Sequence, residues 1–208
     1  MTFVIAIDGP AASGKGTLGR RLAEKYGLHH LDTGLLYRAT AAAVLAEGSR
    51  LSDADKAVAA ARRLDLSALD RATLSSHAIG DAASQIAALP SVRAALLTAQ
   101  KSFARKTPGA VLDGRDITTV ICPDADVKLF VTASPEVRAR RRLAETEMKG
   151  EATTYEAVLA DIMRRDARDS ARADAPLTHH PDAHLIDTTE MDIETAFQTA
   201  CAYVEQSR

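Results

Sequence analysis

Residues 9–17, GPAASGKGT, constrain the fold more than any other segment of the chain. They follow residues 3–8, whose length and β-branched content are typical of a buried strand. They precede residues 18–26, in which apolar side chains recur at helical spacing. A strand, a glycine-rich turn with a lysine, and a helix are together the context of a phosphate-binding loop. The sequence therefore predicts an α/β fold built around an anion-binding turn.

The residue types of this loop suit a nucleotide. Gly9 and Gly14 let the backbone curl so that successive N–H groups point at one anion, and the start of the helix adds a positive dipole end. Lys15 supplies a positive charge for the β- and γ-phosphates of ATP. The alternative is a chance glycine-rich turn, which the flanking strand and helix disfavour. The predicted ATP-binding residues are Gly9, Pro10, Ala11, Ala12, Ser13, Gly14, Lys15, Gly16 and Thr17.

The residue after Lys15 narrows the class of phosphate-binding loop. Most phosphate-binding loops place Ser or Thr directly after the lysine, whereas here Gly16 intervenes before Thr17. This Gly-Lys-Gly-Thr string is similar to the loops of nucleoside monophosphate kinases rather than those of GTPases or motor ATPases. Thr17 is then the nearest hydroxyl for the Mg²⁺ that accompanies ATP, and Asp113, after a later apolar strand, is the expected second metal-side group.

Length and charge exclude several other classes. A chain of 208 residues can bury one core, with a small inserted lobe. A net charge of −2 gives no basic field for nucleic acid or anionic membrane, and no apolar run reaches the length of a transmembrane helix. Cys122 and Cys201 lie far apart without metal-like spacing, which favours reduced thiols. We expect a cytoplasmic protein with no nucleic-acid or membrane partner.

Strands alternate with helical patterns along the chain. Besides residues 3–8, short apolar runs near 28–31, 110–112, 127–131 and 184–186 predict strands, and so a doubly wound, five-stranded parallel sheet with helices on both faces. Polar residues at the carboxyl ends of such strands lie beside the phosphate loop. Candidate ligands are therefore Thr33, Tyr37 and Arg38 after the second strand and residues 113–116 after the third; a helix cap and an exposed arginine are the alternative for the first group.

The segment between the second and third strands is mostly helical. Ser52 is the expected N-cap of a helix that ends near Leu64, a further helix starts at Ala78, and Pro90 interrupts it. Residues 47–106 are too long for a simple crossover, which predicts an inserted lobe. We therefore predict one kinase domain, 1–208, made of a core (1–46, 107–137 and 173–208), an acceptor-binding insert (47–106) and a helical lid (138–172).

Arginines concentrate between residues 138 and 172. An apolar helical stripe of Tyr155, Val158, Leu159 and Ile162 continues on the same predicted face as Arg165, Arg168, Asp169 and Arg172. Arginine binds phosphate oxygens bidentately and stays charged when desolvated, so these residues are predicted to clamp phosphates. The alternative is a solvated helix face with pairs such as Arg165–Asp169. Residues 150–154 break the segment into helix, loop and helix, the form of a lid that excludes water.

Several strings together resemble the bacterial cytidylate kinases over nearly the whole chain. They are residues 7–18, Leu31-Asp32-Thr33-Gly34 with Tyr37-Arg38, Ala83-Ser84-Gln85, Asp113-Gly114-Arg115-Asp116, and Arg165-Asp166 with Arg168-Asp169 and Arg172. The resemblance implies transfer of the ATP γ-phosphoryl group to CMP or dCMP, with Mg²⁺, by a cytoplasmic monomer.

The resemblance also implies roles for individual residues. Thr33, Arg38 and Arg115 would meet the acceptor phosphate, Ser84, Arg93 and Asp116 would read cytosine, and Tyr37, Arg165 and Asp169 would lie near the ribose. The expected catalytic set is Lys15, Asp113, Arg115, Arg165 and Arg168. Thr118 stands where the family usually has glycine, and residues 65–77 are too short for the small antiparallel sheet usual in the family's insert.

Two other functions remain open at this point. One is a phosphate-loop kinase for another acceptor, such as UMP, AMP, or a sugar or shikimate hydroxyl. The other is a nucleotide switch that hydrolyses without an acceptor. The switch predicts a Ser or Thr directly after Lys15 and a water-positioning glutamine, and neither is evident in the sequence.

Overall fold

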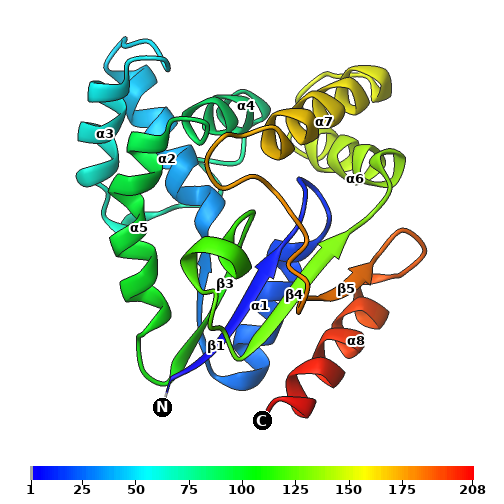
Figure 1. Cartoon of the computed structure of the whole chain (residues 1–208). Helices are drawn as coiled ribbons and strands as arrows, with labels where there is room; N and C mark the ends of the chain where they lie inside the picture. The colour runs from blue at the N-terminus through cyan, green and yellow to red at the C-terminus, as the bar shows by residue number, and fades with distance from the viewer. Residues whose placement is uncertain (1) are drawn as a thin grey trace. The chain divides into compact units, whose positions relative to one another are not determined.

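A computed structural model describes residues 2–208, and all of its strands belong to one parallel sheet (Figure 1). The strand order is β2-β3-β1-β4-β5, and every neighbouring pair is parallel. This confirms the predicted α/β fold with five parallel strands. The strands are β1 (Phe3–Asp8), β2 (His29–Asp32), β3 (Gly109–Gly114), β4 (Val127–Thr132) and β5 (His184–Asp187).

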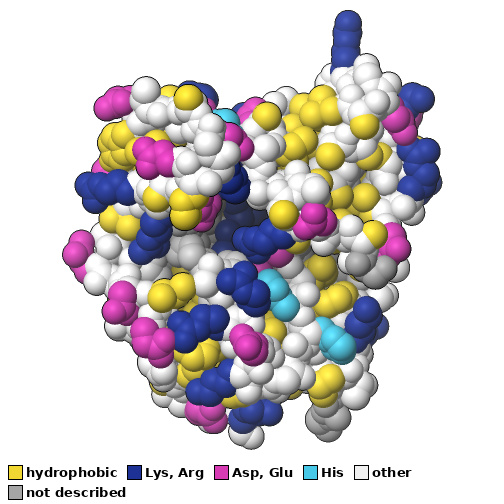
Figure 2. All heavy atoms as spheres, turned by 180° about the vertical axis from the view of Figure 1, so that it is seen from behind, with side chains coloured by type: hydrophobic (Ala, Val, Ile, Leu, Met, Phe, Trp, Pro, Cys, Tyr) yellow, Lys and Arg dark blue, Asp and Glu magenta, His cyan; other side chains and the backbone are white. Residues whose placement is uncertain are grey.

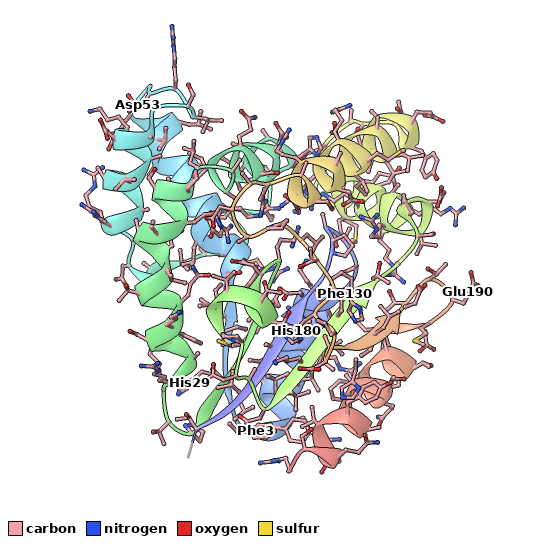
Figure 3. All side chains as sticks on the ribbon, viewed as in Figure 1. Phe3, His29, Asp53, Phe130, His180 and Glu190 are labelled. Atoms are coloured by element: carbon pink, nitrogen blue, oxygen red, sulfur yellow. The ribbon has the colours of Figure 1, made fainter. Side chains whose placement is uncertain are left out.

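The central position of β1 places the phosphate loop. The chain passes from β1 to β2 and β3 on one side of β1 and then crosses to β4 and β5 on its other side. Ligands of such sheets bind at the carboxyl ends of the strands where the strand order reverses in this way. Figure 3 shows Phe3 and His29 together at the amino ends of β1 and β2. Asp8 and Asp32 end the same two strands and therefore lie at the opposite edge, where the loop begins.

Eight helices and two short helical turns connect these strands across residues 2–208. The helices are α1 (Lys15–Tyr26), α2 (Thr33–Ala46), α3 (Ala54–Arg62), α4 (His77–Ile86), α5 (Pro90–Ala104), α6 (Pro135–Glu147), α7 (Tyr155–Ser170) and α8 (Ile193–Gln206). A 3₁₀ turn spans Leu66–Ala68 and a π-helical turn spans Ile117–Ile121. Within the described residues, no helix is both long enough and apolar enough to cross a membrane.

By contacts, the chain separates into two compact units. The sheet unit comprises Met1–Asp32 and Lys101–Arg208, and the helical unit comprises Thr33–Gln100. The division into core, insert and lid given above stays a prediction. Figure 2 shows that Lys and Arg are interspersed with Asp and Glu on the face it draws, as a net charge near zero leads one to expect.

The core of the sheet unit lies between the strands and two helices. Ile5 and Leu129 of the sheet pack with Leu22 of α1 and with Phe197 and Val204 of α8. Burying an aliphatic or aromatic side chain of this size stabilises the fold by about 1.5–3 kcal/mol. Helix α1 ends at Gly27, which takes the left-handed conformation (φ 65°) and donates its N–H to the last carbonyls of the helix.

The helical unit buries large aliphatic side chains such as Leu36 and Ile86 together with many alanines. Helix α2 packs against α3 and α4, and Ala41, Ala57, Ala60 and Ala83 are buried there. Alanine lets helix backbones approach closely while it removes apolar surface from water. The described residues of this unit contain no strand, in agreement with the expectation for residues 65–77.

Several predicted boundaries were wrong by one or two residues. The N-cap of α3 is Asp53 and not Ser52, because the Asp53 side chain accepts a hydrogen bond from the Lys56 N–H (3.1 Å). That helix ends at Arg62, before the predicted Leu64. Helix α4 begins one residue before Ala78, after the N-cap Ser76. The break before Pro90 is confirmed, and Pro90 begins α5.

Candidate active site

The phosphate loop joins β1 to α1 through unusual backbone conformations. Gly9 has φ 153°, and a Cβ there would overlap the Val131 carbonyl, so only glycine fits. Gly14, the N-cap of α1, also has positive φ (90°) and has no side chain to accept the first N–H groups of the helix. Unused N–H groups at a helix start, beside a glycine turn, form an anion site. The loop therefore has the backbone that the sequence predicted.

Lys15 is held inside this loop. Its Nζ donates a hydrogen bond to the Pro10 carbonyl (3.1 Å), and the residue is 9% exposed. Burial, and next the charge of Arg115, lower the pKa of Lys15 to about 7, although Asp113 opposes the shift. A phosphate beside this ammonium would stabilise its charged form.

Asp113 is the penultimate residue of β3, beside the loop, and is bonded to a histidine. The distance from His30 Nε2 to Asp113 Oδ2 is 2.9 Å, and Asp113 is 2% exposed. Gly19 of α1 leaves room for the pair, since a Cβ there would lie 3.1 Å from His30 Nε2. The two residues are 83 positions apart, so no local sequence signal could have identified the pair.

The oxygens near the loop suit magnesium. Mg²⁺ takes oxygen ligands and is usually held by one or two carboxylates together with substrate phosphates. Asp113 offers a buried carboxylate and Thr17 offers a hydroxyl on the first turn of α1. Among residues 2–208, no cluster of three or more His, Cys, Asp and Glu side chains could hold a metal alone. These residues therefore fit a metal that arrives with the phosphates of ATP.

Two arginines converge on Asp169. Arg115 Nε donates to Asp169 Oδ2 (2.8 Å), and Arg172 donates to Asp169 Oδ1. Burial acts to raise the pKa of Asp169, but the charges of Arg115, Arg172 and Arg165 outweigh it and hold this pKa below its usual range. Asp169 is fully buried, so a single carboxylate orients arginines from two separate segments. Arg115, Asp169 and Arg172 therefore form one ion-paired cluster.

The position of Arg172 corrects the predicted helix face. Helix α7 ends at Ser170, with Ala171 as its C-cap, so Arg172 lies past the helix instead of on its apolar stripe. The Leu177 N–H bonds the Asp169 carbonyl (2.9 Å), which turns the chain back at this point. Arg165 and Arg168 are on α7, as predicted, and both are partly exposed.

Arg138 connects α7 to the phosphate loop. Its guanidinium binds Asp166 of α7 with two hydrogen bonds (3.1 and 2.6 Å) and donates to the Ala11 carbonyl of the loop (3.2 Å). Its Nε donates to the Ala133 carbonyl after β4 (2.8 Å). Ala12 of the loop also packs against the apolar cluster of α6 and α7. Arg138 and Asp166 are 28 positions apart, so no local pattern in the sequence indicates this connection.

The helical unit holds the remaining predicted acceptor ligands. Arg38 of α2 donates to the Leu74 and Ser76 carbonyls (2.8 and 3.3 Å). The Arg93 guanidinium lies 5.9 Å from the Tyr37 ring centroid. Ser84 is buried in α4, and Thr33 is the buried first residue of α2. In the sheet unit, Asp116 is 4% exposed and directly precedes the π-helical turn.

The family model for cytidylate kinase matches residues 5–206. The chain belongs to the cytidylate kinase family. A cytidylate kinase of Rhizobium meliloti (strain 1021) is 62% identical over 205 residues, 99% of this chain and 97% of that protein. The cytidylate kinase of Brucella suis biovar 1 (strain 1330) is 57% identical and covers 99% and 94%. The predicted family is therefore confirmed.

A solved structure supports the fold alone. An uncharacterized protein from Eubacterium ventriosum ATCC 27560 superposes with a TM-score of 0.57 at 14% identity, covering 98% of this chain and 99% of that one. At this identity the match says nothing about substrates. The roles of the individual site residues in this member of the cytidylate kinase family are proposed below.

Proposed function

We propose that this chain transfers the γ-phosphoryl group of ATP to CMP or dCMP, giving ADP and CDP or dCDP. The observation that carries the proposal is the phosphate loop with buried Lys15 near Asp113 and Arg115, in a chain matched by the cytidylate kinase family over residues 5–206. Each of these three side chains answers a need of phosphoryl transfer, namely neutralising charge and fixing position.

The donor is bound by the sheet unit. Loop N–H groups and Lys15 hold the β- and γ-phosphates of ATP, with Gly9 and Gly14 setting the shape of the loop. Asp113 and Thr17 are the residues that would hold Mg²⁺, which supplies positive charge to the phosphate oxygens when bound. The negative charge of the phosphates keeps the Lys15 ammonium protonated, and no covalent enzyme intermediate is needed.

Arginines neutralise the migrating group. Phosphoryl transfer spreads negative charge over three equatorial oxygens, and guanidinium groups stabilise that charge. Arg115 is oriented by Asp169, and α7 carries Arg165 and Arg168. Arg172 supports the same carboxylate from the other side.

The acceptor is recognised by charge and by hydrogen-bond direction. Cytosine presents an N4 amino donor where uracil presents an O4 acceptor, so an ionised Asp116 accepts from the first and repels the second. In the helical unit, Ser84 and Arg93 are assigned to the base, Thr33 and Arg38 to the phosphate. Tyr37, Arg165 and Asp169 are assigned to the ribose.

The setting of this reaction is proposed on chemical grounds. ATP and CMP or dCMP are small metabolites, so we place the protein in the cytoplasm as a monomer that needs neither nucleic acid nor membrane. On the face drawn in Figure 2, Asp and Glu side chains lie among the Lys and Arg side chains, which supports this choice because a binding face for nucleic acid is dominated by Lys and Arg.

A coupled assay of ADP release tests the proposal. We expect CMP and dCMP to be far better acceptors than UMP, AMP, GMP or shikimate. Lys15→Met should lower kcat by about a thousandfold while the melting temperature stays near that of the wild type. Highest activity with another acceptor would refute the proposal, and ADP release that needs no acceptor would indicate a nucleotide switch.

A further inference from the structure

The last residue of β1 is bonded to the turn that follows Asp116. The fully buried carboxylate of Asp8 accepts hydrogen bonds from the Ile117 N–H (2.8 Å), the Thr118 N–H (2.8 Å) and the Thr118 hydroxyl (2.6 Å). Thr118 is fully buried as well. We call these contacts the Asp8–Thr118 clamp.

The clamp does the work of a helix cap. The first N–H groups of a helical turn lack partners within the turn, and the side chain of the N-cap residue usually accepts them. Asp116 stands at the N-cap of the π-helical turn and is a residue type that caps well, yet its side chain makes no cap hydrogen bond. Asp8 accepts from these groups instead. The Asp116 carboxylate is therefore not used to cap its own turn.

The clamp is also anchored on rigid backbone. Asp8 pairs in register with Gly114 of β3 and with Phe130 of β4, so its position is set from both sides. Burial raises the pKa of Asp8 to about 6 against the lowering effect of its donors from Thr118 and Ile117, so the side chain is an ionised acceptor at neutral pH. An ionised acceptor forms stronger hydrogen bonds than a neutral one.

We infer that Asp8 and Thr118 are positioning residues for recognition of the acceptor base, because they hold the start of the turn and so direct Asp116 away from capping and toward the base. The inference rests on the proposed function, in which Asp116 reads cytosine. The Thr118 hydroxyl adds a bond that glycine at this position could not make.

Substitutions of Thr118 test the inference without removing a buried charge. Thr118→Val keeps the shape of the side chain but loses the hydroxyl donor. We expect the ratio of kcat/KM for CMP to that for UMP to fall about three- to tenfold, through KM for CMP, with KM for ATP unchanged. Thr118→Ser retains the donor and should restore the ratio. Asp8→Asn, if it folds, should lower the ratio further.

The neighbouring threonine is a matched control. Within the described part of the chain, the buried hydroxyl of Thr119 has no hydrogen-bond partner. Thr119→Val makes the same chemical change one residue away and should leave the CMP/UMP ratio as in the wild type. If Thr119→Val lowers the CMP/UMP ratio as much as Thr118→Val does, the result would contradict a specific role of the Asp8–Thr118 clamp.

A double substitution separates positioning from a general structural role. In an Asp116→Ala background, Thr118→Val should lower the ratio no further, because the group it positions is gone. Equal losses for CMP and UMP, or the same loss of ratio with and without Asp116, would overturn the inference. The acceptor preference of the wild type is measured first. If the wild type does not prefer CMP, the proposed function is refuted. If the wild type prefers CMP and Thr118→Val has the same CMP/UMP ratio, only the role of the Asp8–Thr118 clamp is refuted.

Discussion

His30 Nε2 lies 2.9 Å from Asp113 Oδ2, and only 3% of the Asp113 side chain is exposed. The imidazole on β2 therefore fixes the orientation of the Asp113 carboxylate near the carboxyl end of β3. Partners of this kind orient metal-binding side chains, and their loss typically costs about ten- to a hundredfold in metal affinity or activity.

His30→Phe is expected to keep the ring volume and lose this hydrogen bond. The Mg²⁺ concentration for half-maximal activity should rise about tenfold, with KM for CMP unchanged. Titration of magnesium at saturating ATP and CMP measures this shift. The control is His29→Phe, since His29 bonds the Thr107 carbonyl and packs edge-on to Phe103 instead of bonding a carboxylate of the site. Equal effects in both variants would contradict the role of His30.

Lys15 should take up a proton when ATP binds at pH 8. Its pKa is about 7 in the ligand-free protein, so most molecules carry a neutral amine at pH 8, and the triphosphate favours the ammonium. Calorimetric titration in buffers of different ionisation enthalpy should give an uptake of roughly 0.5–1 proton. At pH 6 the amine is already charged and the uptake should vanish. Lys15→Met should take up no proton at either pH. If the wild type takes up no proton at pH 8, Lys15 does not bind the phosphates of ATP.

The arginines of α7 should affect turnover more than stability. Arg168→Ala is expected to lower kcat about a hundredfold with a small change in melting temperature, because the side chain neutralises transferred charge. Arg164→Ala is the matched control: Arg164 lies on the same helix with 65% of its side chain exposed and forms an ion pair with Asp161. Exposed pairs of this kind contribute about 0–1 kcal/mol. If Arg168→Ala has wild-type turnover, Arg168 does not act on the phosphates, and it belongs to a solvated face of the helix.

Asp169→Asn should destabilise the fold in a pH-dependent manner. Removing one charge from a buried pair costs about 3–5 kcal/mol, since Arg115 and Arg172 would lose their carboxylate. The pKa of Asp169 is lowered in the folded state, so its contribution is complete above the unfolded pKa and is lost as pH falls toward the folded pKa. Urea unfolding at pH 7 and at pH 3 should show the wild-type advantage shrinking at low pH. If the free energy of unfolding differs between the wild type and Asp169→Asn by the same amount at both pH values, the result would argue against a charged Asp169.

Asp116→Ala should reduce discrimination between bases. Uracil opposite an ionised carboxylate places two acceptors together, at a cost of about 1–3 kcal/mol, whereas cytosine donates to it. We expect kcat/KM for CMP to fall while that for UMP stays nearly unchanged, so that the preference shrinks about ten- to hundredfold. Both substrates are measured with both proteins. A CMP/UMP ratio that survives the substitution would mean that another residue reads the base.

The sequence by itself determined the elements whose signals are local. The phosphate loop was predicted because strand, glycines, lysine and helix follow one another within residues 3–26. The parallel direction of the strands could be expected from the alternation of strands and helices. Parallel strands share one carboxyl edge, so Asp113 and Asp116 were expected at the edge that bears the loop. The helix that follows residues 150–154 was predicted from the spacing of its apolar residues. Each of these features depends on neighbours in the chain.

Only the tertiary structure decided which polar groups pair. Asp8 could have capped its own loop, but strand register brings it to Thr118, 110 residues away. His30 and Arg138 likewise carried no signal for their partners Asp113 and Asp166, and Arg172 was assigned to a helix that ends before it. The physical reason is that periodicity and turn chemistry are written in adjacent residues, whereas a buried charge is satisfied by whichever donor the packed strands and helices bring within hydrogen-bond distance.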